Sequence, residues 1–480
     1  MQEFGLLNIT ILIVYMSIMM LLGLWFSRGR DTAEDYFLAG RSMPWLVVGM
    51  SMFASLTSAV TYIGVPAIAY YDNVSIFFGV MASLLVAPLL TRVFYSIYLR
   101  ENVTTSYQYI ASRFGPGARY CVSALFVLTR LGWLGNVIFA PSLALSAATG
   151  IHLSWCIIII GFLATVYTVL GGLKAVLWTD VFQFVLLAGG AVFIVFKLAA
   201  DVEGGFAGIL AQAAENAKLD VLDFRIDLFK MTAAIALFSY LLSFMQDYGV
   251  DQVTVQRLIS VGSIRGIKKA VYFNAFTDII INAVLLFIGL GLFAFFKTTA
   301  LPEDVQGSAI LPHYIVNYLP AGISGLIVTA IFAAAMSSLD SGINSVSTVI
   351  VNDFIVPLKK GVSEHQKVAI GRLLTFVLGI IAIISAFYAG RIGDIVKVTS
   401  SFLGMFSAPV LVLFLAGILS RKCTFLHWVP GLAVSLCVSF YLQQFTQVHW
   451  IYYFPAGFIS CFGVTVLGLL FFAKNNNAQA

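Results

Sequence analysis

Long apolar stretches, separated by short polar connections, run through the whole chain. A helix that crosses the hydrocarbon core of a bilayer needs about 20 mostly apolar residues. Thirteen stretches meet this requirement, at 5–27, 45–70, 75–98, 119–147, 153–172, 178–199, 231–252, 270–296, 321–353, 367–390, 398–420, 426–445 and 449–473. We therefore expect an all-helical protein that spans a lipid bilayer about thirteen times. The ninth stretch is too long for one perpendicular crossing, so it should tilt, protrude or break.

Composition supports the membrane assignment. Of the 480 residues, 60% are hydrophobic and 10% are charged, whereas soluble domains contain roughly 25% charged residues. The five cysteines are scattered, mostly within apolar stretches, with neither metal-ligand spacing nor a disulfide framework. The N-terminus lacks the charged start and the cleavage site of a signal peptide. The first apolar stretch is therefore expected to remain as a span.

The distribution of Lys and Arg predicts the orientation of the chain. Cytoplasmic connections of membrane proteins carry an excess of these residues. If the N-terminus is outside, 19 of the 27 Lys and Arg residues fall inside and seven outside, while Arg130 lies within a span. We therefore expect a multi-pass protein of the cell membrane with a cytoplasmic C-terminus. The net charge of +5 reflects this topology, and no nucleic acid partner is expected.

The sequence contains no signature of an enzyme. A Gly-rich phosphate loop followed by Lys-Ser/Thr is absent, which disfavours a pump driven by ATP. Hydrolase motifs are absent as well, and the five histidines lie mostly at the ends of spans. We expect no catalytic residues and no obligatory protein partner.

A polar segment, 333–345, interrupts the apolar character of the ninth stretch. Ser337, Asp340 and Ser341 are three and four residues apart, so one helical face can carry them all. Such groups are costly in hydrocarbon unless they face a partner or water, and several oxygens suit Na⁺. Alternatively, small residues let helices approach closely while serines bond to the backbone. The carboxylate of Asp340 favours the ion-binding explanation over the packing explanation.

Two other spans contain signs of a broken helix. In the second span, hydroxyl residues between 51 and 61 precede Gly64 and Pro66. Carbonyls freed at a break are tolerated only beside a cavity or an ion, an arrangement typical of secondary transporters. A simple proline kink is the alternative.

Segment 246–252, five spans later, is the second candidate for a broken helix, and its spacing suits two inverted five-helix repeats. An interfacial position of Asp247 and Asp251 is the alternative there.

Another pair of polar residues lies inside the eighth span. Asp278 and Asn282 are one helical turn apart. Carboxylates within a membrane usually have a function, although an ion pair between Asp278 and Arg130 is an alternative explanation.

Four motifs resemble the sodium/solute symporter family. They are DYFLAGRS at 35–42, YTVLGGLKAV at 167–176 with WTD at 178–180, QVTVQR at 252–257, and AAAMSS at 333–338. They occur in family order, and the resemblance extends over about 30–420. It implies a LeuT-like core of two inverted five-helix repeats and Na⁺-driven uptake by alternating access. The expected divisions are an extra N-terminal helix (1–30), the core (31–420, with repeats at about 45–200 and 231–420), and two further helices with a short tail (421–480).

The resemblance also implies ion sites. The family's Na⁺ site falls on the backbone carbonyls of Ala54, Thr57 and Ala334 and on the hydroxyls of Ser337 and Ser338. Members that resemble bacterial sialic-acid symporters have a second ion position. Here it falls on Ser337, Asp340 and Ser341, with Asp180 close by. The family has Ser where this chain has Asp340, so the position is expected to hold a second Na⁺ or to take up H⁺.

The substrate positions implied by the resemblance depart from the known patterns. They are Ser58, Thr61, Trp133, Phe244, Asp247, Asp278 and Ser400. The sugar pattern would place Gln at 61, Asn at 133, Lys at 278 and Gln at 400, and the sialic-acid pattern would place Arg at 133. Segments 139–143 and 249–252 look more like the iodide, monocarboxylate and multivitamin branch. Asp247 and Asp278, however, would repel an anion.

We therefore expect a Na⁺-coupled symporter that imports a small polar, sugar-like solute. Three alternatives are a Na⁺-coupled transporter of a monocarboxylate or another small anion, an H⁺-coupled symporter, and a transporter-like solute sensor that acts through a kinase. The sensor is disfavoured because no cytoplasmic domain follows the last span.

Overall fold

The computed structural model describes residues 5–26, 32–219, 223–225, 227–303, 305–359, 361–390 and 395–476. Within these ranges every regular element is a helix. The first half contains α1 (Leu6–Phe26), α2 (Ala33–Leu38), α3 (Trp45–Leu56), α4 (Ala59–Tyr71), α5 (Ile76–Leu89), α6 (Tyr95–Arg100), α7 (Ser106–Phe114), α8 (Pro116–Thr149), α9 (Leu153–Asp201) and α10 (Gly205–Glu215). The second half contains α11 (Ala233–Gly249), α12 (Gln252–Ile259), α13 (Ile264–Thr298), α14 (Ile310–Tyr318), α15 (Ile323–Val349), α16 (Val356–Leu358), α17 (Glu364–Ala389), α18 (Ile395–Phe402), α19 (Ala408–Leu419), α20 (Phe425–Phe445) and α21 (Tyr453–Asn476).

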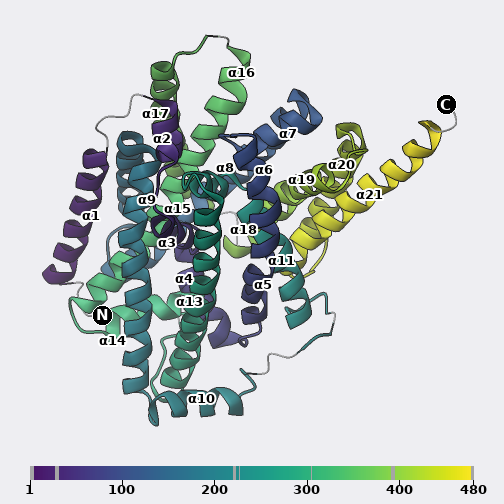
Figure 1. Ribbon diagram of the computed structural model, residues 1–480. Coiled ribbons are helices and arrows are strands. Elements are labelled where there is room, and N and C mark those ends of the chain that lie inside the picture. Colours follow the sequence, from purple (N-terminus) through teal and green to yellow (C-terminus); the bar gives the residue numbers. More distant parts are fainter. Residues whose placement is uncertain are drawn as a thin grey trace.

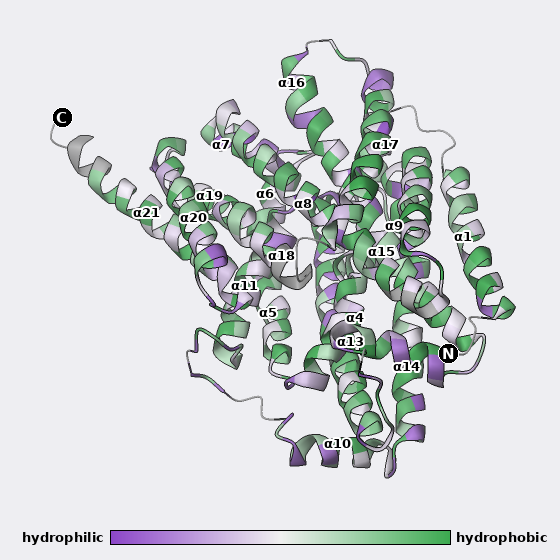
Figure 2. Ribbon diagram, turned by 180° about the vertical axis from the view of Figure 1, so that it is seen from behind, coloured by the Kyte–Doolittle hydropathy of each residue, from purple (hydrophilic) through white to green (hydrophobic). Residues whose placement is uncertain are grey.

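The helices form one bundle, in which α1 lies on one flank and α20 and α21 lie on the opposite flank (Figure 1). Hydrophobic residues cover most of the helical ribbon, while the α10 connection is rich in hydrophilic residues (Figure 2). Large apolar side chains such as Trp25, Trp155 and Phe196 are exposed on the outside of the bundle. A lipid environment, unlike water, makes such exposure favourable, so the membrane assignment holds.

Ten described helices are long and apolar enough to cross a membrane, and the bent pair of α3 and α4 makes an eleventh span. The difference from thirteen has two sources. The 49-residue helix α9 covers two expected spans, which meet at Gly172, where φ is 58° and ψ is −163°. Helix α11 has 17 residues, so it falls just short of a full span by length. The all-helical, broken-helix architecture is confirmed, and the count of thirteen stays a prediction.

Helix α15 forms the centre of the bundle. It packs against α9, α8, α1, α17 and α3, and nearly all its residues are buried. A π-helical segment, η4 (Ile350–Ile355), joins it to α16 without a break, giving a continuous 36-residue stretch. The ninth stretch therefore protrudes, since α16 and the start of α17 together extend beyond the ends of the other helices (Figure 1).

Helix α1 is tied closely to the centre. The side-chain oxygen of Asn8 accepts hydrogen bonds from the backbone amides of Gly322 and Gly325, at 2.7 and 3.1 Å. These amides belong to the start of α15, where the first turn has no helical acceptors. Farther along, Gly23 lies so close to Tyr167 that a Cβ atom at Gly23 would approach the Tyr167 Cβ to 2.6 Å. Helix α1 thus caps α15 and packs tightly on α9.

The break in the second span is not at its proline. Helices α3 and α4 meet at 62°, and the chain leaves the helical conformation at Thr57 (φ −82°, ψ 81°). Ser58 then caps α4, because its hydroxyl accepts from the amide of Thr61. Pro66 lies inside α4, where its carbonyl faces Gly289 of α13 so closely that a Cβ there would lie 2.3 Å away. The break is therefore made by a capping serine, and Pro66 marks a close helix contact.

Candidate ion and substrate sites

The broken ends of α3 and α4 lie against the polar turn of α15. The hydroxyl of Ser338 donates to the backbone carbonyl of Ser55 at 3.2 Å. The hydroxyl of Ser55 lies 3.3 Å from that of Ser337 and 3.0 Å from that of Ser341. The structure thus brings together the two segments that sequence reasoning placed on one ion.

The break frees backbone oxygens at this contact. In an unbroken helix the amides of Ser58 and Thr61 would donate to the carbonyls of Ala54 and Thr57. Instead, the Ser58 amide donates to the Leu56 carbonyl, and the Thr61 amide donates to the Ser58 hydroxyl. The expected ligand set (Ala54, Thr57, Ala334, Ser337 and Ser338) is fully buried and consists of oxygen donors. This donor chemistry suits Na⁺, a hard cation.

A buried carboxylate adjoins these hydroxyls. Asp180 of α9 accepts hydrogen bonds from Ser51 at 2.5 Å and from Ser55 at 3.2 Å. The Ser337 hydroxyl donates to the other carboxylate oxygen of Asp180 at 2.5 Å. The guanidinium of Arg257 lies 3.4 Å from Asp180. Asp180 is therefore linked to both α3 and α15.

Arg257 occupies a position that the sequence did not predict. The positive-inside count placed it in a cytoplasmic connection, but it is 1% exposed because the short helix α12 carries it into the bundle. Its Nε donates to the Ser51 hydroxyl at 2.9 Å and an Nη donates to the Val253 carbonyl at 2.8 Å. A further bond joins it to Ser341. The last residue of the QVTVQR motif thus supplies a cation to the network.

Asp340 faces a different partner. The hydroxyl of Tyr167 donates to one carboxylate oxygen, and the Ser341 hydroxyl donates to the other at 3.0 Å. Sequence reasoning quoted Tyr167 only as part of a motif and missed this contact. The residues expected at a second ion position (Asp180, Ser337, Asp340 and Ser341) form one continuous, fully buried hydrogen-bond network.

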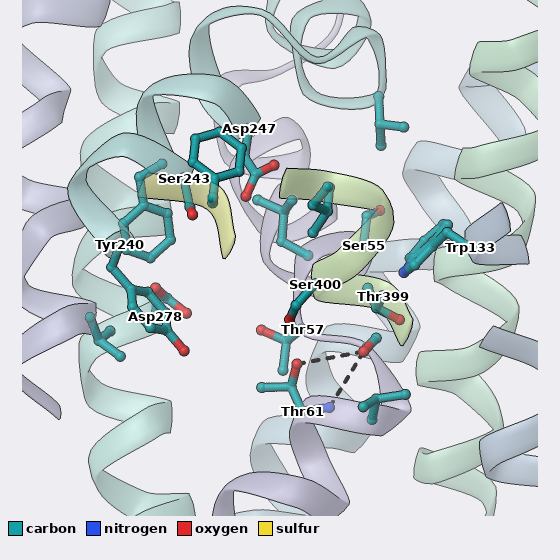
Figure 3. A pocket seen from close by; sticks show the side chains of 18 of the residues that line it. Ser55, Thr57, Thr61, Trp133, Tyr240, Ser243, Asp247, Asp278, Thr399 and Ser400 are labelled. Atoms are coloured by element: carbon teal, nitrogen blue, oxygen red, sulfur yellow. Dashed lines mark hydrogen bonds between the residues drawn. The ribbon is translucent and has the colours of Figure 1, made fainter. Parts of the chain in front are cut away.

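A cavity of about 330 Å³ lies beside the break. All seven predicted substrate positions line it: Ser58, Thr61, Trp133, Phe244, Asp247, Asp278 and Ser400. Ser55 and Thr57 line it too, so the cavity adjoins the candidate Na⁺ site (Figure 3). Sequence reasoning missed several polar lining residues, among them Asn136, Tyr240, Ser243, Tyr248 and Asn274. The spacing of Tyr240, Ser243 and Asp247 on one face of α11 would have indicated two of them.

The charged groups of segment 246–252 and its surroundings have definite partners. Arg130 forms an ion pair with Asp251 at 2.5 Å, and Asp251 is 2% exposed. An interfacial position of Asp251 and a pairing of Arg130 with Asp278 are therefore both wrong. Asp278 instead accepts a hydrogen bond from Asn282 at 2.9 Å. Asp247 lines the cavity without a hydrogen-bond or ion-pair partner among the described residues.

The second interruption lies between α11 and α12, at Val250 and Asp251, as expected. Three hydroxyl groups donate to its buried carbonyls: Tyr95 to that of Tyr248 at 2.5 Å, Tyr98 to that of Gly249 at 2.5 Å, and Ser106 to that of Val250 at 2.7 Å. Backbone acceptors at membrane depth require such partners. These bonds join the interruption to the segment that contains α6 and α7.

A helix broken at buried oxygens, beside a cavity with polar groups in its lining, is typical of a secondary transporter. The family model of the sodium:solute symporter family matches residues 36–426, and the chain belongs to this family. It is 30% identical to the sodium/sialic acid symporter SiaT of Proteus mirabilis, over 98% of this chain and 95% of that protein. It is also 30% identical to the sodium-coupled monocarboxylate transporter 2 of Mus musculus, over 86% of this chain and 68% of that protein.

A solved structure shows the same fold. It is the substrate-bound outward-open state of a Na⁺-coupled sialic acid symporter, which is 30% identical and matches with a TM-score of 0.92 over 98% of both chains. The family expectation and the LeuT-like fold are thereby confirmed. The protein is a multi-pass membrane transporter, and Na⁺ is its coupling ion.

Proposed function

We propose that this protein imports a small polar organic solute together with Na⁺, by alternating access. The observation that carries the proposal is the contact of the Ser338 hydroxyl with the Ser55 carbonyl, beside the freed carbonyls of Ala54 and Thr57. We assign the Na⁺ site to these two carbonyls together with Ala334, Ser337 and Ser338. We assign a second cation position to Asp180, Ser337, Asp340 and Ser341.

The shared break explains how ion and solute binding are coupled. A Na⁺ ion between α3 and α15 would fix the conformation of Thr57 and Ser58, and both residues line the solute cavity. A solute in contact with them would in turn favour the ion, because coupling between two binding sites is reciprocal. The Na⁺ gradient then drives the loaded protein through its conformational cycle.

The similarity to sodium/sialic acid symporters and the hydroxyl- and amide-rich lining favour a sugar-like solute. The alternative of a monocarboxylate follows from the similarity to sodium-coupled monocarboxylate transporters. Two carboxylates in the cavity oppose it, since an anion beside Asp247 and Asp278 would be repelled. The excess of Lys and Arg supports a cytoplasmic C-terminus and an outward N-terminus.

The test uses the purified full-length protein. Thermal unfolding in a Na⁺ series and in a K⁺ series of equal ionic strength measures ion binding, because a ligand that binds the native state raises its stability. Proteoliposomes then report ²²Na⁺ uptake in the presence of external solutes. Na⁺-specific stabilisation and solute-stimulated ²²Na⁺ uptake are expected.

Two further measurements separate the alternatives. Uptake in Na⁺-free buffer under an imposed pH gradient would identify H⁺ coupling in place of Na⁺ coupling. Solute binding without any accumulation inside the vesicles would identify a sensor. Equal stabilisation by Na⁺ and K⁺ would overturn the assigned Na⁺ site.

A further inference from the structure

The solute cavity is lined by more acidic than basic side chains. Among its described lining residues the charged ones are Arg130, Asp247 and Asp278. Arg130 is already neutralised, because its guanidinium lies 2.5 Å from Asp251. The same guanidinium lies within electrostatic range of Asp247, but one cation cannot offset three carboxylates. An unpaired carboxylate away from bulk water is costly unless a positive group accompanies it.

The surroundings of Arg130 hold it in place. Its guanidinium lies over the rings of Trp133 and Phe126, at 4.8 and 5.8 Å from their centroids, and the residue is buried. Together with the Asp251 ion pair, these contacts hold the guanidinium against the wall of the cavity. Its Nε has no hydrogen-bond partner among the described residues, but its charge is already offset by Asp251, so it offers no free positive charge to the carboxylate of a solute.

The two uncompensated carboxylates lie on neighbouring walls. Asp247 shares one face of α11 with Tyr240 and Ser243, while Asp278 lies on α13 (Figure 3). The side-chain amide of Asn274, one turn before Asp278, donates to the Tyr248 hydroxyl at 2.9 Å and so joins the two helices. Figure 3 shows both carboxylates on the opposite side of the cavity from Trp133.

A buried acceptor adds independent support. Asn274 is 1% exposed and lines the cavity, yet its side-chain oxygen has no hydrogen-bond partner among the described residues. Buried polar atoms are nearly always hydrogen-bonded, so this oxygen points to a donor that the bound solute supplies. The acceptors at this wall therefore comprise the Asp247 and Asp278 carboxylates and the Asn274 amide oxygen.

We propose that the transported solute carries a protonated amine, which binds between Asp247 and Asp278. An ammonium group offers three donors and one positive charge, which suits the three acceptor groups of Asp247, Asp278 and Asn274. The hydroxyls of Ser58, Thr61 and Ser400 would hold the polar skeleton of the solute, and Trp133 would close the far wall. This proposal rests on the proposed Na⁺-coupled transport and specifies its substrate class.

The experiment compares matched pairs of probes, which differ in charge but little in size. The pairs are glucosamine and glucose, ethanolamine and ethylene glycol, and L-serine and glycerate; N-acetylneuraminate and lactate represent the anions. Thermal unfolding of the full-length protein is followed with each probe in Na⁺ and in K⁺. At least one amine should raise the unfolding temperature in Na⁺ only, and its uncharged or anionic partner should not.

Three variants locate the binding group. Asp247→Asn and Asp278→Asn remove one charge each while keeping size, and each should weaken the apparent affinity for the amine at least tenfold. Glu215→Gln, at an exposed end of α10, changes the net charge equally and should leave the affinity unchanged. The stabilisation by Na⁺ alone should persist in all three variants.

The outcomes distinguish this proposal from the function on which it rests. A Na⁺-dependent shift with an anion or a neutral sugar but with no amine would overturn the substrate class and leave Na⁺ coupling intact. An amine affinity that both Asp variants retain would overturn the binding mode. The absence of any amine response while Na⁺ still stabilises the protein also counts against the substrate class. Loss of Na⁺ stabilisation in the unmodified protein would instead overturn the proposed function.

Discussion

The hydroxyl of Ser338 on α15 donates to the backbone carbonyl of Ser55, the next-to-last residue of α3. This 3.2 Å contact joins the continuous central helix to a backbone oxygen of the broken one. A serine inside a helix commonly bonds to the carbonyl four residues earlier, as Ser142 does with Ile138. Ser338 turns outward instead, toward the freed oxygens of α3.

Replacement of Ser338 by alanine should abolish the Na⁺-specific rise in unfolding temperature. The variant lacks one of five oxygen ligands and the hydrogen bond to α3, while the small side chain still fits the buried position. Thermal unfolding in Na⁺ and K⁺ measures the effect. Ser435→Ala provides the matched control, because this buried serine of α20 donates to the Gly457 carbonyl at 2.8 Å, away from the site. A full Na⁺ response in Ser338→Ala would refute the ligand assignment.

Asp180 and Arg257 should contribute to the stability of the protein as a coupled pair. Arg257→Gln leaves Asp180 and Asp340 buried without their nearby cation, and removal of one partner of a buried pair costs about 3–5 kcal/mol. The double variant Asp180→Asn with Arg257→Gln should recover part of this loss. The unfolding free energies of the four proteins form a double-mutant cycle. Additive effects of the two changes would show that the residues are not coupled.

Gly172→Ala should destabilise the protein strongly. The backbone there has φ 58° and ψ −163°, a region that is essentially restricted to glycine and costs about 1–3 kcal/mol for other residues. A Cβ would also lie 2.7 Å from the Tyr36 carbonyl, which adds about 1–3 kcal/mol of overpacking. Gly189→Ala, in the same helix with open space around it, should be neutral or slightly stabilising. Equal stability of the two variants would contradict this explanation.

Asp340→Asn should change the dependence of transport on ion concentration without preventing Na⁺ binding at Ser338. The amide lacks the charge that would hold a second cation, so the Hill coefficient for Na⁺ in ²²Na⁺ uptake should fall toward one. Tyr167→Phe removes the hydroxyl donor of Asp340 and should shift the Na⁺ dependence less. An unchanged Hill coefficient in Asp340→Asn would exclude this residue from the second cation position.

Much of the architecture could be predicted because local signals agreed with the fold. Apolar stretches of membrane-crossing length defined the spans, and the hydroxyl-rich segments at 51–61 and 333–345 identified the two helices that meet. Segment 246–252 was recognised as an interruption from its Asp, Gly and Gln residues. These features are encoded within single segments, so the sequence displays them directly.

Contacts between distant segments could not be predicted in the same way. Arg257 resembled a cytoplasmic positive charge, since nothing nearby in the sequence shows that α12 turns inward to meet Asp180. Pro66 was the strongest local breaker, but Ser58 caps the actual break. Asp278 was the partner considered for Arg130 from the sequence, but the geometry selects Asp251. Charge pairing across a bundle depends on tertiary packing, which a single sequence does not display.

The side chain of Asn8 accepts hydrogen bonds from two backbone amides at the start of α15. These bonds give the first helix a role beyond lipid contact. A shortened protein that begins near residue 32 would leave those donors without their acceptor and release the N-terminal end of α15, the helix to which the Na⁺ site is assigned. Such a protein should fold less well and bind Na⁺ more weakly, although every assigned ligand would still be present. The first helix is therefore an anchor for the sodium site and a poor place for truncation.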